Sequence, residues 1–391
     1  MSGDDQQSRE AAVNAAFERG DNQRGLELLR SLAAHYPDPA RFHRQAVIEE
    51  QIGSADKALS AHLACLSLAP NNPMAYLYGG YCLHQQGRTE DALSVFSLGS
   101  DLDGSLLAAP QPGHGQETER RLATCNSALR AHFSRLHEEA VGDALEVARI
   151  RESVWVRTHD CPQSPPASGQ QPHLFYVPGL EPIRYADTHA LDWAAGIEAA
   201  SDIIVQEFLD AVPVIGESGR PYLAEGTSLG EAFSPLVGSL NWTALDLYRD
   251  GQRNNAIADH FVQTLSVLGN APLYGLGEMP FEVFFSVLKA GQHISPHYGL
   301  SNHSLTVHLP IIAPPNCELA VAGESRPWEP GTLMAFDDTF LHEAVNRSEE
   351  DRVVLIFSTW HPDLSNAERQ AIQRSFNARQ AWLDQRHLPT V

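Results

Sequence analysis

The residues best suited to chemistry in this 391-residue chain are histidines that gather between residues 293 and 361. Four of them occur in the segment QHISPHYGLSNHSLTVHLP. His342 follows in FDDTFLHEAVN, and a sixth, His361, comes after Arg352 in DRVVLIFSTWHP. Neutral imidazole is the commonest protein ligand for metal ions. A single histidine is more often a surface or core residue than a ligand, so only the combination indicates a metal site.

Short apolar runs bounded by Gly, Pro and Asn carry these histidines: FEVFFSVLK, SLTVHLPIIA, CELAVA, GTLMAF and RVVLIFSTW. Several strands at such short spacing are typical of an all-β sandwich or jelly roll. Along LTVHL, the alternation of a strand places Thr306 and His308 on one face, opposite Leu305, Val307 and Leu309. His308 can therefore face a pocket while its neighbours pack.

The spacing of four residues in this region indicates which kind of metal chemistry the histidines could support. His297 is followed by Gly299, then by His342 after 45 residues, and then by Arg352 after ten more. This order resembles that of the metal ligands and co-substrate anchor in jelly-roll iron(II) dioxygenases. Two imidazoles suit Fe(II) and leave positions open for oxygen and a bidentate 2-oxo acid. An arginine offers a planar, two-pronged donor set for a carboxylate.

A wider resemblance covers about half of the chain. Residues 173 to about 370 resemble the aspartate/asparagine β-hydroxylase family of 2-oxoglutarate-dependent dioxygenases. The segments that carry the resemblance, in the same order, are NWTALDLYRDGQR, FSVLKAGQHISPHYG, HLPIIAPPNCELAV, RPWEPGTLMAFDDTFLHEAVN and RVVLIFSTWHPDLS. The resemblance implies that His297 and His342 bind Fe(II) and that Arg352 anchors 2-oxoglutarate. It also implies that Ser286 and His308 hydrogen-bond this co-substrate.

The chain departs from the wider superfamily at Gly299. The commonest arrangement has a carboxylate two residues after the first histidine, and glycine has none. In the family that the chain resembles this gap is normal, with water in the vacant position. Asp337 and Asp338 could be proposed as replacements, but we expect them to form a turn and to orient His342 by a hydrogen bond.

A second departure concerns the substrate. Members of the family often carry arginines shortly before the second pocket histidine, and these help to receive the acidic group of the substrate. The segment SNHSLTVH offers His303, Ser304 and Thr306 there, and no arginine. Loss of charge-assisted hydrogen bonds worth about 1.5 to 3 kcal/mol each is enough to change the class of substrate. Elsewhere, we expect Trp328 to stabilise a hairpin and His361 to be structural.

The first hundred residues repeat with a period of 33 or 34, marked by Gly20, Gly53 and Gly87. Each repeat predicts two helices joined at a glycine turn and ended by proline. Residues 1–104 therefore resemble about three degenerate tetratricopeptide repeats. Such repeats bind a peptide or a partner protein on a concave surface, or they cap a neighbouring domain or form dimers; the sequence leaves these alternatives open.

The expected architecture has several domains. Helical repeats (1–104) precede a helical connector with Pro/Gly-rich loops (105–172). A double-stranded β-helix, or jelly roll, with flanking helices follows (173–391).

Composition limits the partners and the compartment. The formal net charge of −22 disfavours nucleic acid and anionic membrane surfaces. The five cysteines, Cys161 among them, form no C-x-x-C pair, and an odd number so far apart argues against a disulfide framework. The chain shows no secretory signal and no apolar run long enough for a membrane span. We therefore expect a cytoplasmic protein without a membrane span.

The leading hypothesis is an Fe(II)- and 2-oxoglutarate-dependent dioxygenase that uses O2, releases succinate and CO2, and hydroxylates an aspartyl- or asparaginyl-like residue. Its substrate is then a protein or peptide held by the repeats. A second hypothesis is hydroxylation of a small molecule, such as an amino acid, a peptide natural product or a lipid acyl chain, with the repeats forming a homo-oligomer. A third is a non-catalytic repeat adaptor with a relic jelly roll.

Overall fold

The computed structural model describes residues 3–107, 113, 115–158, 166–215, 218–227 and 230–389. Its contacts divide the chain into two compact units. We name residues 1–136, 157–160 and 379–391 the repeat unit, and residues 137–156 and 161–378 the sheet unit. The domain limits expected at residues 104 and 172 stay predictions, and Cys161 lies outside the described residues.

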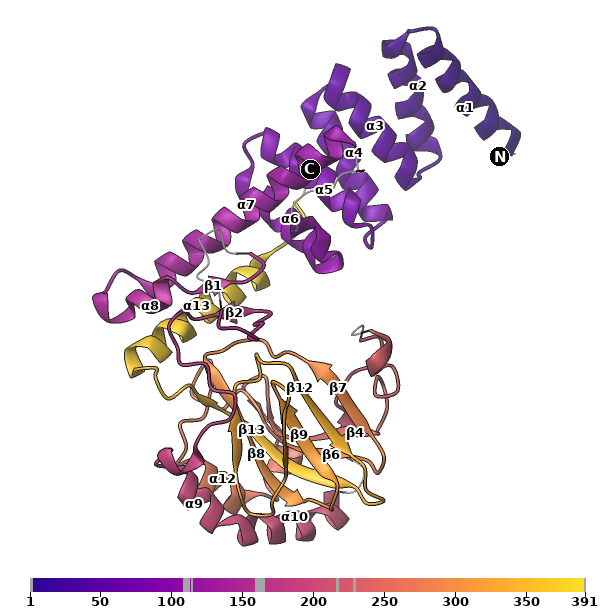
Figure 1. The fold of residues 1–391 in the computed structure, drawn as a ribbon. Coiled ribbons are helices and arrows are strands. Elements are labelled where there is room, and N and C mark those ends of the chain that lie inside the picture. The colour runs from indigo at the N-terminus through magenta and orange to yellow at the C-terminus, as the bar shows by residue number, and fades with distance from the viewer. Residues whose placement is uncertain are drawn as a thin grey trace. The chain divides into compact units, whose positions relative to one another are not determined.

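The repeat unit begins with three helical pairs, visible in Figure 1 as successive antiparallel hairpins. The pairs are α1 (Gly3–Glu18) with α2 (Asn22–His35), α3 (Pro39–Ile52) with α4 (Ala55–Leu68), and α5 (Pro73–Gln85) with α6 (Thr89–Leu102). Gly20 and Gly87 adopt positive φ angles of 76° and 73° in the turns. The predicted helical repeats are thus confirmed.

Sequence features at the helix ends explain where these helices begin. Asp38 and Asn72 accept hydrogen bonds from backbone N–H groups of the first turns of α3 and α5, and proline fills the first helical position of both. Inside the unit, Gly80 lies so close to Phe96 that a side chain there would overlap the ring. The repeated small residues are therefore what lets neighbouring helices approach.

The repeat unit is completed by parts of two long helices. A short 3-10 turn, η1 (Gly104–Leu107), precedes α7 (Gln116–Val141), and α13 (Asn366–Gln385) comes near the end of the chain. From α7, Leu122, Cys125 and Leu129 join the core that α4 to α6 form, and Trp382 of α13 packs against it.

The sheet unit is a sandwich of two antiparallel sheets (Figure 1). The smaller has the order β10 (Glu324–Pro327), β9 (Cys317–Val321), β12 (His342–Asn346), β7 (His293–His297). The larger has the order β11 (Met334–Phe336), β8 (Ser304–Ile312), β13 (Arg352–Trp360), β6 (Val283–Leu288), β4 (Trp242–Arg249), β3 (Arg220–Pro221), with β5 (Gln252–Arg253) beside β4. The predicted jelly roll is confirmed.

Helices and turns surround this sandwich. They are η2 (Leu145–Val147), α8 (Ala148–Arg151), η3 (Thr188–Ala190), α9 (Ala194–Ala199), α10 (Ser201–Ile215), η4 (Glu231–Phe233), α11 (Asn255–Ala258) and α12 (Val262–Leu268), with a two-stranded ribbon of β1 (Val154–Trp155) and β2 (Phe175–Tyr176). Helix α10 buries Ile204 and Phe208 against the outer face of the larger sheet. A second core fills the space between the sheets.

Alternation along the strands decides which side chains face that inner space. On β6, Phe284 packs between the sheets and Phe285 packs beneath the helices, so Ser286 points inward with Phe284. On β13, Val354 and Ile356 point inward in the same way. Every strand expected from the apolar runs is present, and the two sheets also contain β3, β4, β5, β7, β10 and β12.

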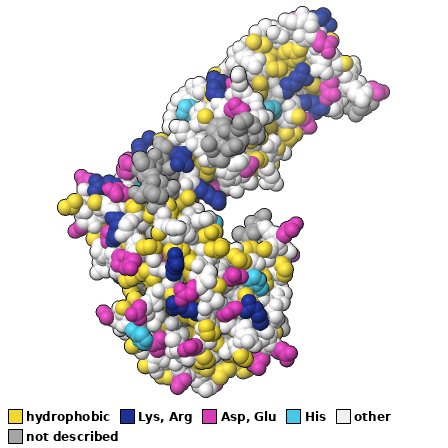
Figure 2. Space-filling view, in the orientation of Figure 1, with side chains coloured by type: hydrophobic (Ala, Val, Ile, Leu, Met, Phe, Trp, Pro, Cys, Tyr) yellow, Lys and Arg dark blue, Asp and Glu magenta, His cyan; other side chains and the backbone are white. Residues whose placement is uncertain are grey.

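No described helix is both long enough and apolar enough to cross a membrane. Four of the five cysteines fall in the described part of the chain, and all four are buried free thiols. On the face shown in Figure 2, outside the grey atoms, lysines and arginines are scattered among acidic side chains and form no continuous basic patch.

Candidate metal and 2-oxoglutarate site

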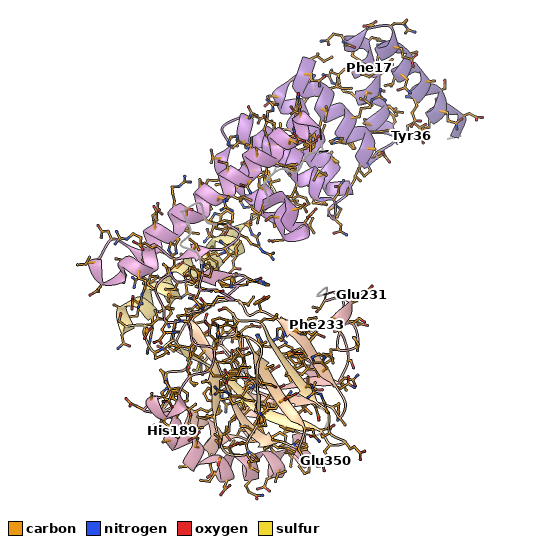
Figure 3. The ribbon with its side chains drawn as sticks, in the orientation of Figure 1. Phe17, Tyr36, His189, Glu231, Phe233 and Glu350 are labelled. Atoms are coloured by element: carbon orange, nitrogen blue, oxygen red, sulfur yellow. The ribbon has the colours of Figure 1, made fainter. Side chains whose placement is uncertain are left out.

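Strands β7 and β12 place two histidines side by side. His297, at the end of β7, is the register partner of His342, at the start of β12. Their ring centroids are 4.1 Å apart. Phe233, labelled in Figure 3, packs edge-on against His297 with centroids 5.7 Å apart. Sheet pairing therefore brings together two residues that are 45 positions apart in sequence.

Both rings are held in a form that suits metal binding. The Nδ1 of His297 lies 2.8 Å from the carbonyl oxygen of Ser295, and the Nδ1 of His342 lies 2.9 Å from that of Phe340. Because a carbonyl only accepts, each Nδ1 carries the proton and each Nε2 keeps its lone pair. Burial lowers the pKa of both, to about 3 for His342, so both rings are neutral at physiological pH.

The position that lacks a carboxylate is filled from the turn between β11 and β12. A side chain at Gly299 would collide with the carboxylate of Asp338, and the backbone N–H of Gly299 donates to the carbonyl of Asp338 at 2.6 Å. Burial, followed by the charges of Asp337 and Glu282, raises the pKa of Asp338 to about 8. The Asp338 carboxylate thus lies where a residue-299 side chain would be.

The structure shows the turn that was expected of Asp337, but not its expected hydrogen bond to His342. Its carboxylate accepts hydrogen bonds from Thr339 and from Gln170, at 2.6 Å for the latter. The ring of His342 is instead oriented by the backbone carbonyl of Phe340. Asp337 therefore shapes the turn before β12, and the backbone takes over the orienting bond.

Arg352 enters the inner space from the start of β13. It is 1% exposed, and its guanidinium lies 4.8 Å from the ring of Trp328. Its Nη2 reaches Ser286 Oγ at 3.5 Å, while its buried Nε has no hydrogen-bond partner. Within the described residues, no carboxylate forms an ion pair with Arg352. Burial lowers its pKa to about 10, so the group still carries its charge at neutral pH.

His308 lies close to both Arg352 and His342. It is 6% exposed, its Nδ1 accepts a hydrogen bond from Trp328 Nε1 at 3.3 Å, and Phe336 lies edge-on at 5.2 Å. Burial, then the nearby Arg352 and His342, hold its pKa well below the usual value. All five residues singled out in the sequence thus lie around the inner space. Their roles stay predictions.

Sequence reasoning missed several residues of this pocket. Trp328, expected only to stabilise a hairpin, also contacts both His308 and Arg352. Trp242 donates from Nε1 to Ser286 Oγ at 3.1 Å and so fixes that hydroxyl. Strand alternation in NWTALDL could have placed Trp242 on an inner face, but no local pattern shows which side chain it meets.

The remaining histidines of the cluster lie elsewhere. His293 is exposed and pairs with Glu343 at 2.7 Å. His303 is 2% exposed and packs among aromatic rings that include Tyr274 and Phe376. His361 is buried beside the carbonyl of Glu181 at 3.0 Å, as a structural residue would be.

A second group with metal-ligating atoms lies in the repeat unit. The ligand atoms of Glu50, His62 and Cys82 are within 4.8 Å of one another. However, Arg121 contacts both carboxylate oxygens of Glu50, at 2.5 and 3.2 Å. Because the charge of Glu50 is already matched by a guanidinium, we interpret this group as a buried ion network.

Most of the sheet unit matches a known protein family in sequence. Residues 198–362 match the model of the aspartyl/asparaginyl beta-hydroxylase family. This confirms the resemblance for that part of the chain. The human aspartyl/asparaginyl beta-hydroxylase is 24% identical over 326 residues, covering 82% of this chain and 38% of the human protein. The mouse aspartate beta-hydroxylase domain-containing protein 2 is 45% identical over 217 residues, covering 53% of this chain and 59% of its own length.

The chain spans less than two thirds of the length of these relatives. Among solved structures, the Yersinia enterocolitica type III secretion chaperone SycD, in complex with a peptide of the translocator YopD, matches at 19% identity. The match covers 34% of this chain and 96% of that chain, with a TM-score of 0.27.

Proposed function

We propose that the sheet unit is an Fe(II)- and 2-oxoglutarate-dependent hydroxylase in which His297 and His342 hold the metal. The observation that carries the proposal is the burial of the Arg352 guanidinium without a carboxylate partner among the described residues. A fully buried guanidinium without a carboxylate partner is costly unless an anion binds it. It faces the same inner space as two neutral histidines whose Nε2 atoms keep their lone pairs. A metal ion held by the two histidines, together with a dicarboxylate bound to Arg352, would satisfy both features.

The residues present suit this pair of ligands. Arg352 is proposed to bind the far carboxylate of 2-oxoglutarate, with Ser286 Oγ beside it. Trp242 donates to Ser286 Oγ, which therefore can direct its own proton toward the co-substrate. The Nδ1 of His308 is occupied by Trp328, which leaves its Nε2–H as a donor.

Fe(II) bound there would supply O2 activation and the oxidative decarboxylation of 2-oxoglutarate to succinate and CO2 that drives hydroxylation. The protein keeps the ligand rings neutral and correctly turned through two backbone carbonyls. Phe336 and Trp328 line the pocket with apolar surface and limit access of water. Asp338 places a carboxylate where residue 299 has none.

The substrate we propose to test first is a side chain of a protein or peptide, because the relatives are named for aspartyl and asparaginyl residues. Binding of that polypeptide by the repeat unit is part of the proposal. A cytoplasmic location and a homo-oligomer stay predictions from the sequence.

The experiment uses the full chain, purified without oxygen and supplied with Fe(II), 2-oxoglutarate and then O2. Succinate release without added substrate measures the basal reaction. Peptide pools and small-metabolite pools are then compared for stimulation and for products heavier by one oxygen atom. We expect stimulation by peptides, and stimulation by small molecules alone would instead favour the second hypothesis of the sequence analysis.

The matched variants are His342→Ala and His293→Ala. Both remove an imidazole from a strand of the smaller sheet, but His293 is exposed and pairs with Glu343. We expect His342→Ala to abolish succinate release and His293→Ala to leave it unchanged. Equal release from wild type and His342→Ala, or none from wild type, would reject the enzyme and leave the adaptor hypothesis.

A further inference from the structure

A pocket with a volume of about 520 Å³ opens on the sheet unit, outside the space between the two sheets. We name it the outer pocket, and its lining includes Tyr248, Leu265, Pro272, Trp360 and Arg369. Tyr248 and Leu265 pack against the core beneath the helices, and Trp360 belongs to the core beside α13. In the described part of the chain, the core between the sheets contributes no residue to this lining.

The outer pocket is well separated from the proposed co-substrate site. Arg352 begins β13 and Trp360 ends it, so the two sites are about 26 Å apart along that strand. None of the residues assigned to the metal or to 2-oxoglutarate lines the outer pocket. A ligand of this pocket would therefore be a molecule additional to the proposed co-substrate.

Arg369, in the first turns of α13, brings an unpaired cation to this pocket. Its side chain is half-buried, and its Nε is buried without a hydrogen-bond partner. Among the described residues, no carboxylate forms an ion pair with it. The neighbouring Glu368 is already engaged, because both of its oxygens accept hydrogen bonds from Arg149 at 2.9 Å. A guanidinium that has lost part of its hydration and gained no partner favours the binding of an anion.

Glu278 also lines the outer pocket, but its surroundings differ. Its side chain is exposed, and an exposed carboxylate keeps its water and needs no partner. Within the described part of the chain, it forms no ion pair with Arg369. The charge that lacks compensation in this pocket is therefore the positive one.

Hydrogen bonds fix the wall of the pocket beside Arg369. The N–H of Trp360 donates to the carbonyl of Pro272 at 2.9 Å, and Nε2 of Gln373 donates to the carbonyl of Gly275 at 2.8 Å. Gln373 lies one turn after Arg369 on the same side of α13. The loop between α12 and β6 is thus held against the helix and the strand that flank the guanidinium.

Apolar surface lies beside this single unpaired charge. Leu265, Pro272 and Trp360 line the pocket with side chains that carry no charge. An apolar lining with a few polar groups that fix the orientation of a ligand is typical of a site for a small organic molecule.

We propose that the outer pocket binds a small monocarboxylic acid with an apolar or aromatic body. The carboxylate pairs with the guanidinium of Arg369 in the planar, two-pronged geometry that this group prefers. The body of the acid lies against Trp360 and Pro272. Glu278, on the exposed side, disfavours phosphate and other doubly charged anions. The inference goes beyond the proposed function and does not depend on it.

The test uses the full chain without metal or 2-oxoglutarate. Two probes are titrated, para-fluorophenylacetate and its neutral amide, which has nearly the same shape. Broadening of the fluorine resonance of each probe measures its binding. We expect the acid to bind about 10-fold more tightly than the amide, because only the acid forms charge-assisted hydrogen bonds. Acetate, which lacks the ring, should displace the acid only at a concentration at least about 10-fold higher.

Variants localise the binding. Arg369→Met should remove the preference for the acid over the amide. Arg369→Lys should keep part of it, because an ammonium keeps the charge but lacks the planar fork. Arg249→Met is the matched control, since it removes an exposed cation next to Tyr248 and should leave both affinities unchanged. None should change the melting temperature by more than a few degrees, because neither arginine forms a buried ion pair among the described residues.

Arg352→Met is included because the guanidinium of Arg352 is another unpaired cation that an acid could reach. We expect this variant to bind the acid as tightly as the wild type does.

The outcomes are distinct. Equal affinities for acid and amide, no binding of either probe, or a preference that survives in Arg369→Met overturns the proposal. Loss of the preference in Arg352→Met would mean that the acid binds in the inner space, and it overturns the proposal as well. None of these results bears on the metal site, which the release of succinate tests.

Discussion

Two arginines, one in each unit, are almost fully buried but have opposite surroundings. Arg121 of α7 is 3% exposed and contacts Glu50 and Glu117, and its guanidinium stacks on Tyr78 and Tyr81 at 4.2 and 4.5 Å. Burial alone would lower the pKa of Arg121, but the hydrogen bond and charge of Glu50 outweigh it and raise the pKa. The repeat unit thus neutralises its buried cation internally.

Arg352 has aromatic and hydroxyl neighbours, Trp328 and Ser286, but no acidic partner among the described residues, and burial lowers its pKa to about 10. Burial costs the two guanidinium groups similar hydration, so their partners decide the difference. The comparison shows that burial of a charge is not evidence of function. Function is indicated where the compensating charge is missing from the chain.

The comparison is tested most severely by Arg352→Met, which keeps an unbranched side chain but is shorter and removes the charge. We expect the affinity for 2-oxoglutarate to fall at least about 100-fold, because charge-assisted hydrogen bonds to the far carboxylate worth ~3 kcal/mol are lost. Titration of the Mn(II)-loaded chain with 2-oxoglutarate measures this. The melting temperature should stay the same or rise, since removing an unpaired buried charge relieves a cost.

The outcome that would contradict this interpretation is a large loss of stability with little change in affinity. Arg352 would then be a structural residue like Arg121. Lys289→Met, which removes an exposed cation just past the end of neighbouring β6, is the matched control and should alter neither quantity measurably.

The sequence predicted which residues meet in the inner space better than it predicted what surrounds them. His297, His342 and Arg352 were singled out by a family resemblance in their order and spacing, and strand alternation put His308 on an inner face; their roles stay predictions. These signals are local or depend on order along the chain. They sufficed because antiparallel pairing converts a fixed order of strands into fixed neighbours.

The missed features all depend on contacts between distant segments. Asp338 fills the space above Gly299 because of how the turn before β12 lies against the end of β7. Glu282, just before β6, accepts a hydrogen bond from Ser358 of the neighbouring β13. Such pairings leave no periodicity in the sequence. The repeats, in contrast, were visible because each contacts mainly its neighbours.

Arg121→Met tests the buried arginine of the repeat unit, whose charge is neutralised within the chain. It leaves Glu50 partly buried with His62 alone, and we expect the repeat unit to lose about 2 kcal/mol of stability. Hydrogen exchange of amides in α3 to α6 measures this unit separately from the sheets. Affinity for 2-oxoglutarate should not change. In the double variant Arg121→Met/Glu50→Leu most of the loss should be recovered, and a further loss would show that Glu50 has another cationic partner.

Gly299→Asp would sharpen the account of the metal site by adding the carboxylate that the wider superfamily carries. We expect about a 10-fold loss of Mn(II) affinity, ~1.4 kcal/mol, because the new side chain collides with Asp338 and pushes apart the strands that hold the histidines. Gly299→Asp/Asp338→Gly should restore binding. A gain in affinity from Gly299→Asp alone would show that Asp338 moves aside easily and does not occupy this position when metal binds.

The smallest expected effect is a pH dependence confined to the repeat unit. Burial alone would raise the pKa of Glu50, but hydrogen bonds from His62 and Arg121 and their charges lower it from 4.5 to about 2. A carboxyl whose pKa is lower in the folded state stabilises the fold above pH 4.5, and this stability is lost as the pH falls toward 2. Between pH 7 and pH 4 we expect the repeat unit to lose about 1 kcal/mol through Glu50.

Amide exchange of α3 to α6 over this pH range, in the wild type and in Glu50→Gln, isolates that contribution. Glu50→Gln should be less stable at pH 7 and should lose less stability on acidification, because its amide does not titrate. Parallel curves for the two proteins would mean that the Arg121–Glu50 pair is not what neutralises the buried guanidinium. The contrast with Arg352 would then depend on Glu117, which contacts Arg121 from the preceding turn of the same helix.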